Sequence, residues 1–412
     1  MHTADWHLGK LLGERSRAEE HRRLLAFLLE RVASLSVDAL VIAGDLFDSA
    51  NPPQSAVAQY YDFLSTLFRQ GGCSVVVVAG NHDSPAHLEA PRQVLRALRA
   101  HVVGVMPNPV EGGLIPLPSA EAPRLVVAAV PFLRDRDLRQ GEAGQGTAAI
   151  QRELVQGIQR RYAEAAEACR PWGARGLPLL ATGHLTVLGA VTSESEREIH
   201  IGGQGAVAAD CFPEAFAYVA LGHLHRPQRV GRREHIRYAG SPIELSFSEA
   251  GDAKELRLLD FDEGRLISQA PLPVPRFRAL AQVNTTPGAI ETDLRRFEPP
   301  PGELPAWVEV VVNDPLPGEN VYDRVQRLVE GRDFEVIRVV GRRGTPLAGM
   351  SAPAGTEAED LGVLLGNPSS IFARRLAAEA GLSESERAAL NGAFRELLSL
   401  HDERAREGET SA

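Results

Sequence analysis

Acidic, histidine and amide side chains recur in short motifs along the first half of the chain. Asp5 and His7 lie two residues apart near its start. The other motifs are Gly44-Asp45-Leu46-Phe47-Asp48, Gly80-Asn81-His82-Asp83, Gly183-His184 and Gly222-His223-Leu224-His225. Carboxylate, imidazole and amide groups without a thiolate favour manganese or iron, with zinc as a further option, over a closed structural zinc site. The seven candidate ligands fit two metal ions better than one.

Each motif taken alone has an ordinary structural explanation. A single histidine is more often a surface or core residue, and Gly-Asn-His-Asp by itself is a common turn. Asp48 and Asp83 can equally serve as caps, because an aspartate after a strand often accepts backbone N–H groups. The metal hypothesis depends on the whole set, since the candidate ligands follow one another in order, mostly after apolar runs.

Apolar runs precede these motifs and predict buried strands at 39–42, 75–78, 125–127, 179–181 and 218–221. Helical spacing of apolar residues between them predicts helices over 19–32, 55–68 and 85–99. Such alternation, up to about Asp262, is typical of a layered α/β domain. Ligands of an open α/β sheet sit at the carboxyl ends of its strands, so these motifs should share one rim.

The pattern changes after a proline-rich passage at 271–275. Predicted strands at 307–312 and 334–340 flank a helix at 321–330, which indicates a second, smaller domain. Gly- and Pro-containing residues then suggest a linker, followed by two short amphipathic helices. We therefore divide the chain into a first domain at 1–270, a second at 275–343, a linker at 344–366 and terminal helices at 367–402.

Composition limits the function classes. A net charge of −10 argues against a surface that binds nucleic acid throughout, so a polyanion must be bound locally or by a partner. Basic residues are almost all arginine, lysine occurring only at Lys10 and Lys254, and we attribute this bias to a GC-rich genome. Cys73, Cys169 and Cys211 suggest neither a disulfide frame nor a zinc site.

The sequence contains neither a run of about 18 apolar residues nor a secretory signal pattern, which predicts a cytoplasmic protein without membrane association. It also has no Gly-x-x-x-x-Gly-Lys-[Ser/Thr] loop, so ATP hydrolysis by a P-loop mechanism is not expected of this chain.

The order D-x-H, G-D-x-x-D, G-N-H-D, G-H and G-H-x-H resembles the signature of the calcineurin-like metallophosphoesterase superfamily. The resemblance implies a layered α/β/β/α core, a β-sandwich flanked by helices. It implies one metal ion held by Asp5, His7 and His225, a second held by Asn81, His184 and His223, and Asp45 bridging the two. His82, Asp48 and Asp83 are assigned to catalysis, His82 as the imidazole beside the ions and the two aspartates as orienting groups.

Three further stretches are similar to the SbcD family, the nuclease subunits of bacterial SbcCD complexes. They are 2–10, 183–187, and Tyr238-Ala239-Gly240-Ser241-Pro242 with Phe247-Ser248-Glu249, and the resemblance runs through about Phe261. It implies a metal-dependent nuclease in DNA repair and recombination, with 3′–5′ exonuclease activity on double-strand ends and endonuclease activity on hairpins and single strands. Mn²⁺ is the expected ion, with Mg²⁺, Fe²⁺ and Zn²⁺ as alternatives.

The same resemblance implies partners. The second domain is similar in position to the family's small α+β capping domain, which binds DNA. The terminal helices resemble the element that docks on an SbcC-type coiled-coil ATPase, although an apolar stripe packing on the protein's own core is an equal alternative. Their apolar residues are Ile371, Phe372, Leu376, Leu390, Phe394, Leu397 and Leu398.

A homodimer is also implied, with Tyr60, Tyr61 and Leu64 either at its interface or packed on the sheet. Only Met1 precedes His2, where family members have several apolar residues, so the first strand should be short. Two other functions stay open: a phosphodiesterase of small diesters or phosphoproteins, and a scaffold at DNA ends with vestigial metals.

Overall fold

The computed structural model describes residues 1–138, 146–191, 196, 206–314, 321–342, 390 and 394. Those up to Arg342 belong to one compact unit, Met1–Thr345. The predicted linker at 344–366 lies outside the described residues. So do the predicted terminal helices at 367–402, apart from Leu390 and Phe394.

The first sheet has six strands in the order β14-β13-β1-β4-β5-β6. Its bounds are β1 His2–Thr3, β4 Ala39–Ala43, β5 Ser74–Val78, β6 Ala100–Val103, β13 Glu255–Asp262 and β14 Arg265–Pro273. Strands β1, β4, β5 and β6 are parallel, whereas β13 runs antiparallel to β1 and to β14. The first strand is short, as predicted, with two residues.

The second sheet also has six strands, in the order β11-β12-β10-β9-β8-β7. Its bounds are β7 Leu114–Leu117, β8 Leu125–Ala128, β9 Leu179–His184, β10 Tyr218–Gly222, β11 Gln228–Val230 and β12 Arg233–Tyr238. Strands β8, β9, β10 and β12 are parallel to one another, and antiparallel strands lie at both edges. Both sheets are therefore mixed, and all the strands predicted before the motifs are present.

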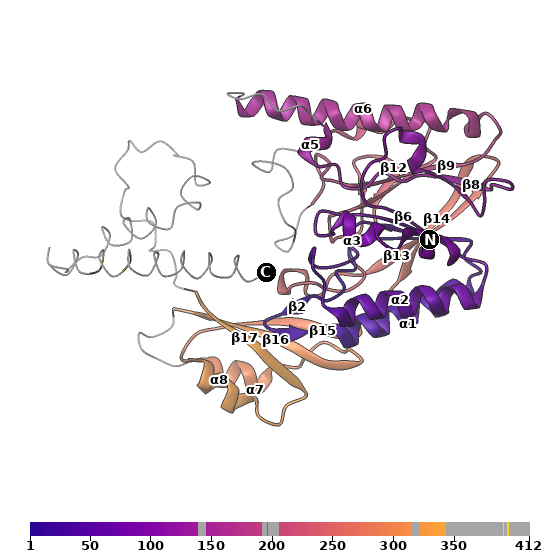
Figure 1. Ribbon diagram of the computed structural model, residues 1–412. Coiled ribbons are helices and arrows are strands. Elements are labelled where there is room, and N and C mark those ends of the chain that lie inside the picture. Colours follow the sequence, from indigo (N-terminus) through magenta and orange to yellow (C-terminus); the bar gives the residue numbers. More distant parts are fainter. Residues whose placement is uncertain are drawn as a thin grey trace. The chain divides into compact units, whose positions relative to one another are not determined.

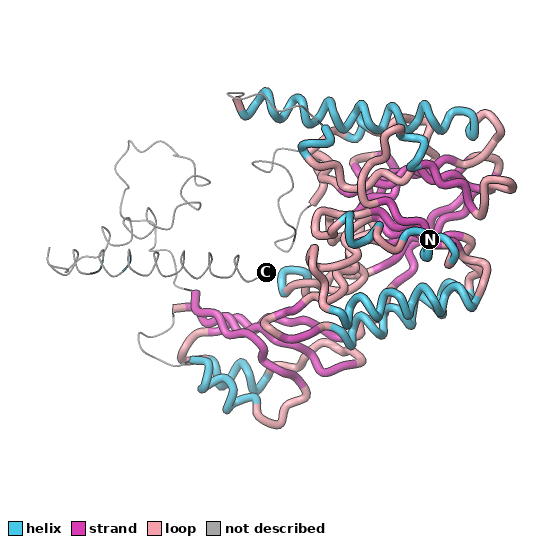
Figure 2. The backbone as a smooth tube through the Cα atoms, viewed as in Figure 1, coloured by secondary structure: helices cyan, strands magenta, loops and turns pink. Residues whose placement is uncertain are grey.

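The two sheets pack against each other through apolar side chains, including Val41 and Val76 of the first and Leu180 and Ala220 of the second. Along β4 the neighbouring side chains Leu40 and Ile42 belong instead to the outer cluster, as expected where successive residues alternate between faces. Helices lie over both outer faces, so the architecture is helix, sheet, sheet, helix (Figure 1, Figure 2). The predicted α/β class is confirmed.

Two long helices, α1 Ala18–Ser34 and α2 Gln54–Gln70, cover the first sheet, and α6 Thr147–Gly173 covers the second. Tyr60 and Leu64 on α2 are buried in the outer cluster of the first sheet. Of the two explanations offered for them, packing on the protein's own core is therefore correct, and the interface prediction is wrong for both. Tyr61 is partly buried against the same cluster.

The single helix predicted over 85–99 is wrong. The chain forms two short helices, α3 Pro85–Glu89 and α4 Arg92–Ala97, separated at Ala90 and Pro91. Proline has no N–H to donate, and its ring collides with the preceding helical turn, so a continuous helix cannot pass through Pro91. A further short helix, α5 Asp135–Leu138, precedes α6.

A third sheet, of three parallel strands, is formed by β15 Arg278–Thr285, β16 Leu304–Asn313 and β17 Phe334–Arg342. Its strands are joined by α7 Ile290–Arg296 and α8 Val321–Val329, which share a separate apolar core with it. The strands and helix predicted here are present, whereas β15 and α7 were not predicted. We call this part the C-terminal domain.

The remaining elements are short. A hairpin is formed by β2 Leu11–Leu12 and β3 Arg15–Ser16, and 3-10 turns by η1 Val110–Gly113, η3 Ala209–Cys211 and η4 Phe247–Glu249. All three cysteines are buried free thiols, as the sequence suggested. In the described part of the chain, no helix combines the length and the apolar character needed to cross a membrane.

Candidate metal centre

Five strand ends, from both sheets, carry the candidate residues. Asp5 and His7 follow β1, Asp45 and Asp48 follow β4, Asn81, His82 and Asp83 follow β5, His184 ends β9, and His223 and His225 follow β10. Although β1 is short, the backbone N–H groups of Asp5 and His7 donate to the carbonyls of Gly44 and Asp45, both at 3.0 Å. These bonds continue the pairing beyond β1 and hold both residues beside the next strand end.

Four candidate ligands have left-handed backbone conformations, which non-glycine residues rarely adopt. The φ angles are 54° for Asp5, 47° for His7, 47° for Asp45 and 96° for His223. Such conformations cost on the order of 1–3 kcal/mol each and cluster at functional sites. The neighbouring glycine is also required: a Cβ on Gly80 would lie 2.1 Å from Asp45 Oδ1.

Asp5, His7 and His225 form one buried group whose ligand atoms lie within 4.8 Å of one another. His7 Nδ1 is 3.1 Å from Asp48 Oδ1, and because an ionised carboxylate only accepts, Nδ1 carries the proton. His7 Nε2 is buried without a hydrogen-bond partner, 3.6 Å from Asp45 Oδ2. A cation between these two atoms would satisfy both, so the group fits a metal ion.

Asp5, Asp45 and His184 form a second buried group with the same spacing. His184 Nδ1 donates to the Ala43 carbonyl at 3.0 Å, which leaves Nε2 2.8 Å from Asn81 Oδ1 and 3.4 Å from Asp45 Oδ2. The rings of His184 and His223 have centroids 5.3 Å apart. The structure therefore brings the seven predicted ligands together, with Asp45 close to both groups.

The titration behaviour shows an excess of negative charge in the metal-free site. Burial raises the pKa of Asp5 to about 7. Burial alone would lower the pKa of His184, but the Asp45 and Asp5 carboxylates raise it to about 9. A proton on His184 thus offsets the carboxylates, and a divalent ion would displace it, since metal binding releases protons from its ligands.

His82 lies beside the two groups. Its Nδ1 donates to the Asp48 carbonyl at 2.7 Å, and its Nε2 is 3.9 Å from Asp45 Oδ2. Its ring meets that of His7 edge to face, with centroids 4.7 Å apart. An open cleft lined in part by Asn81, His82, Arg134 and Arg136 adjoins it.

Asp48 and Asp83 make different contacts. Asp48 accepts from His7 and from Lys10 Nζ at 3.0 Å; burial alone would raise its pKa, but these partners hold the pKa well below the ordinary value. Asp83 accepts from the backbone N–H groups of Leu46, Phe47 and Gly80 at 2.9–3.1 Å, and thus ties the Asp45 loop to the β5 loop.

Comparison with known proteins gives the family. A model described as calcineurin-like phosphoesterase matches residues 1–132, and one described as type 5 capsule protein repressor C-terminal domain matches 276–380. The SbcD component of the Escherichia coli K12 nuclease SbcCD is 36% identical over 402 residues, 97% of each chain. The chain belongs to the SbcD nuclease family.

Other SbcD proteins agree. The one from Rhodobacter capsulatus is 42% identical over 300 residues, 68% of this chain and 71% of that one, and the one from Bacillus subtilis is 38% identical over 267 residues, 64% and 66%. The family resemblance drawn from the motifs is thus confirmed. The chain is a metal-dependent phosphoesterase and nuclease of the SbcD type, which excludes the scaffold alternative.

Sequence reasoning missed three residues of this SbcD site. Glu249, Ser241 and Lys254 surround the far side of His225, away from Asp5 and His7, and were noted only for the family resemblance or for composition. The available signal was Lys254, one of only two lysines in the chain. The other, Lys10, contacts Asp48 in the same centre.

Proposed function

We propose that this SbcD-family chain hydrolyses DNA phosphodiester bonds at a centre of two divalent ions. Asp5, His7 and His225 would hold one ion, Asn81, His184 and His223 the other, and Asp45 would bridge them. The observation that carries this proposal is Asp45 Oδ2, which lies 3.6 Å from His7 Nε2 and 3.4 Å from His184 Nε2. One carboxylate oxygen thus faces a donor atom from each set.

The mixed oxygen and nitrogen donors favour Mn²⁺, with Mg²⁺, Fe²⁺ and Zn²⁺ as alternatives. When bound, such ions supply Lewis acidity and positive charge at the scissile phosphate. The protein's own part is to place His82. The Asp48 carbonyl fixes its Nδ1–H, so a protonated His82 would present Nε2–H on the side of Asp45 and donate it to the departing oxygen. Asp48 and Asp83 act by positioning, Asp48 on His7 and Asp83 on the loop of Asp45.

DNA would enter along the cleft beside His82, where Arg134 and Arg136 provide local positive charge in a chain of net charge −10. As in the SbcCD nuclease that names its relatives, the chain would work with an SbcC-type coiled-coil ATPase, because it carries no P-loop of its own. We propose 3′–5′ exonuclease action on double-strand ends and endonuclease action on hairpins and single strands, in the cytoplasm.

The proposed division of labour follows the domains. Residues 1–270 would form the nuclease domain and 275–343 a DNA-binding capping domain. Residues 344–366 would link these to helices at 367–402 that dock on the ATPase. A homodimer would present two such nuclease domains to the DNA.

Cleavage assays test the proposal. Labelled duplex DNA, single-stranded DNA and a chromogenic phosphodiester are incubated with the full chain in Mn²⁺, Mg²⁺ or chelator, together with His82→Ala and the control His235→Ala, which changes a histidine on β12. We expect Mn²⁺-dependent DNA cleavage that His82→Ala abolishes and His235→Ala retains. Turnover of the small diester alone, with and without an SbcC-type ATPase, would instead assign the centre to small phosphodiesters.

A further inference from the structure

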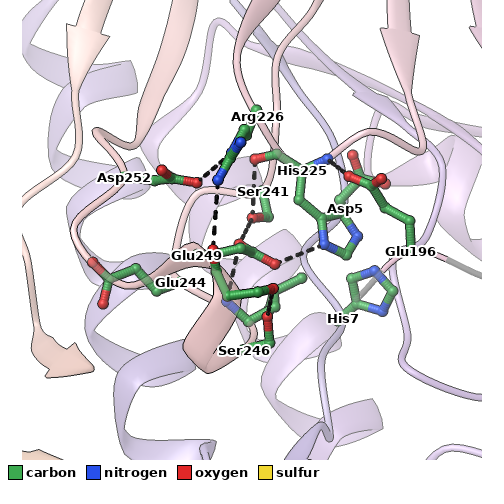
Figure 3. A network of polar contacts seen from close by, with 12 residues as sticks. Asp5, His7, Glu196, His225, Arg226, Ser241, Glu244, Ser246, Glu249 and Asp252 are labelled. Carbon is green, nitrogen blue, oxygen red and sulfur yellow. Dashed lines mark hydrogen bonds and ion pairs between the residues drawn. The ribbon is translucent and has the colours of Figure 1, made fainter. Parts of the chain in front are cut away.

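The segment from Ser241 to Lys254 lies behind His225 and carries a buried carboxylate. Glu249, on the 3-10 turn η4, is fully buried, and its Oε1 lies 2.9 Å from His225 Nδ1 (Figure 3). Because the carboxylate accepts, Nδ1 carries the proton. His225 Nε2 is then left unprotonated as the ring's donor atom for the group with Asp5 and His7.

Glu249 is itself held by a buried lysine. Lys254 Nζ donates to Glu249 Oε2 at 2.6 Å, to Ser241 Oγ at 2.9 Å and to the His225 carbonyl at 3.1 Å. An ammonium has three N–H groups, and here each has an acceptor. The backbone N–H of Leu245 also donates to Glu249 Oε2, at 3.2 Å. The carboxylate therefore has one orientation, and that orientation sets the imidazole ring.

His7 has the same arrangement behind it. Its Nδ1 contacts Asp48 Oδ1 at 3.1 Å, and Lys10 Nζ donates to that oxygen at 3.0 Å. Lys10 and Lys254 are the only lysines among 44 basic residues, so both lysines of the chain lie behind histidines of one ligand group. A GC-rich genome explains the arginines but not the placement of these two exceptions. A lysine suits three acceptors around one point, whereas the planar fork of arginine does not.

We propose that Glu249 and Lys254 are positioning residues for His225, matching Asp48 and Lys10 behind His7, and that together these two clamps set the affinity of one of the two metal positions. The inference rests on the proposed two-ion centre and adds residues that the ligand motifs do not contain. A carboxylate behind a metal-binding histidine fixes the ring and raises its basicity, and loss of such a partner weakens metal binding about 10–100-fold.

The test is a Mn²⁺ titration of the full chain followed by electron paramagnetic resonance, which counts free ions and distinguishes an exchange-coupled pair from isolated ions. Wild type is compared with Glu249→Gln, which keeps the side-chain shape and removes the charge. The matched control is Asp252→Asn, three residues away, whose carboxylate pairs with Arg226 at 2.8 Å and not with a histidine. Thermal unfolding in chelator reports whether each variant is folded.

We expect Glu249→Gln to bind one Mn²⁺ about 10–100-fold more weakly than wild type and the other unchanged, so that the coupled-pair signal gives way to an isolated-ion signal. Asp252→Asn should match wild type. Lys254→Arg, which keeps the charge but not the three-acceptor geometry, should shift the same ion, and it serves as the reporter if Glu249→Gln does not fold.

Wild-type affinities for both ions in folded Glu249→Gln, or in folded Lys254→Arg, would overturn the proposal and leave the two-ion centre standing. Binding of a single ion by wild type would instead overturn the two-ion centre. The positioning role is then read on that ion, where weakening in Glu249→Gln supports it and unchanged affinity refutes it.

Discussion

Two histidines in the centre have the same tautomer but different depths. His82 and His184 both donate Nδ1–H to a backbone carbonyl, at 2.7 and 3.0 Å, so both present Nε2. His184 Nε2 is within 3.4 Å of Asp45 and also contacts Asn81, whereas His82 Nε2 stays 3.9 Å from Asp45. The first arrangement suits a ligand, and the second suits a group that reaches the substrate.

His82→Ala should therefore lower kcat for DNA cleavage by about 10²–10⁴-fold, the range for loss of a general acid, and leave Mn²⁺ stoichiometry unchanged. His184→Ala should lose one ion. Steady-state kinetics and metal counting on the same preparations separate the two roles. Loss of an ion in His82→Ala would mean that His82 is itself a ligand.

Asp83 is held by backbone donors and not by the ligand groups. Asp83→Asn places an amide NH₂ where three backbone N–H groups donate, so we expect the free energy of unfolding to fall by about 1–3 kcal/mol. Urea unfolding in chelator measures it. The control is Asp38→Asn on an exposed ion pair with Arg124, which should change stability by less than about 0.5 kcal/mol. Equal effects of the two variants would show that Asp83 does not hold the loops.

At the scale of elements, η4 joins the metal centre to the C-terminal domain. Glu249 on this turn contacts His225, and Phe247 on the same turn packs with Leu280 of β15 and Trp307 of β16. Upstream of the turn, Glu244 Oε2 accepts from the backbone N–H of Leu280 at 3.0 Å. The C-terminal domain thus helps to fix the segment that positions His225.

Phe247→Ala should consequently weaken one Mn²⁺ position, by less than Glu249→Gln does, because it loosens the turn without removing the carboxylate. Val308→Ala is the matched control, since Val308 is next to Trp307 but packs in the separate core of the C-terminal domain. Mn²⁺ titration of the two variants tests this link, which would be refuted if both bound Mn²⁺ equally well.

The sequence predicted elements whose signals are local. Each strand before a motif was found because a buried strand leaves an apolar run, as at Ser74–Val78. Strand β15 was missed, because its edge position leaves Gln282 and Asn284 exposed and dilutes that run. The partner of His225 was also out of reach: Glu249 lies 24 residues later in the chain, and only the folded turn brings it within 2.9 Å.

For the whole molecule, the net charge of −10 opposes DNA binding, so the affinity for DNA must come from local patches. Arg134→Gln with Arg136→Gln should raise KM for DNA several-fold and reduce its salt dependence, while turnover of a small diester stays unchanged. Arg124→Gln, an exposed arginine outside that cleft, is the control. Kinetics at several salt concentrations measure the effect, and an unchanged KM would place the DNA path elsewhere.

Buried histidines connect the stability of the whole fold to pH. His2 in β1 and His21 in α1 are fully buried, and burial lowers the pKa of each from 6.5 to about 3. Below pH 6.5 the unfolded chain binds protons that the folded chain does not, so the stabilising contribution is complete above pH 6.5 and is lost progressively towards pH 3. Each histidine contributes a slope of up to about 1.4 kcal/mol per pH unit in this window.

His2→Gln removes one of these titrations, although it also disturbs the 3.1 Å contact between His2 Nδ1 and the Tyr218 hydroxyl. The absolute stability at pH 8 reports that disturbance, and the slope of stability between pH 6.5 and pH 4.5 reports the titration. Urea unfolding in chelator should give a shallower slope for His2→Gln than for wild type, by up to about 1.4 kcal/mol per pH unit. Parallel slopes would mean that His2 takes up its proton in the folded chain as readily as in the unfolded one, despite its burial between the sheets.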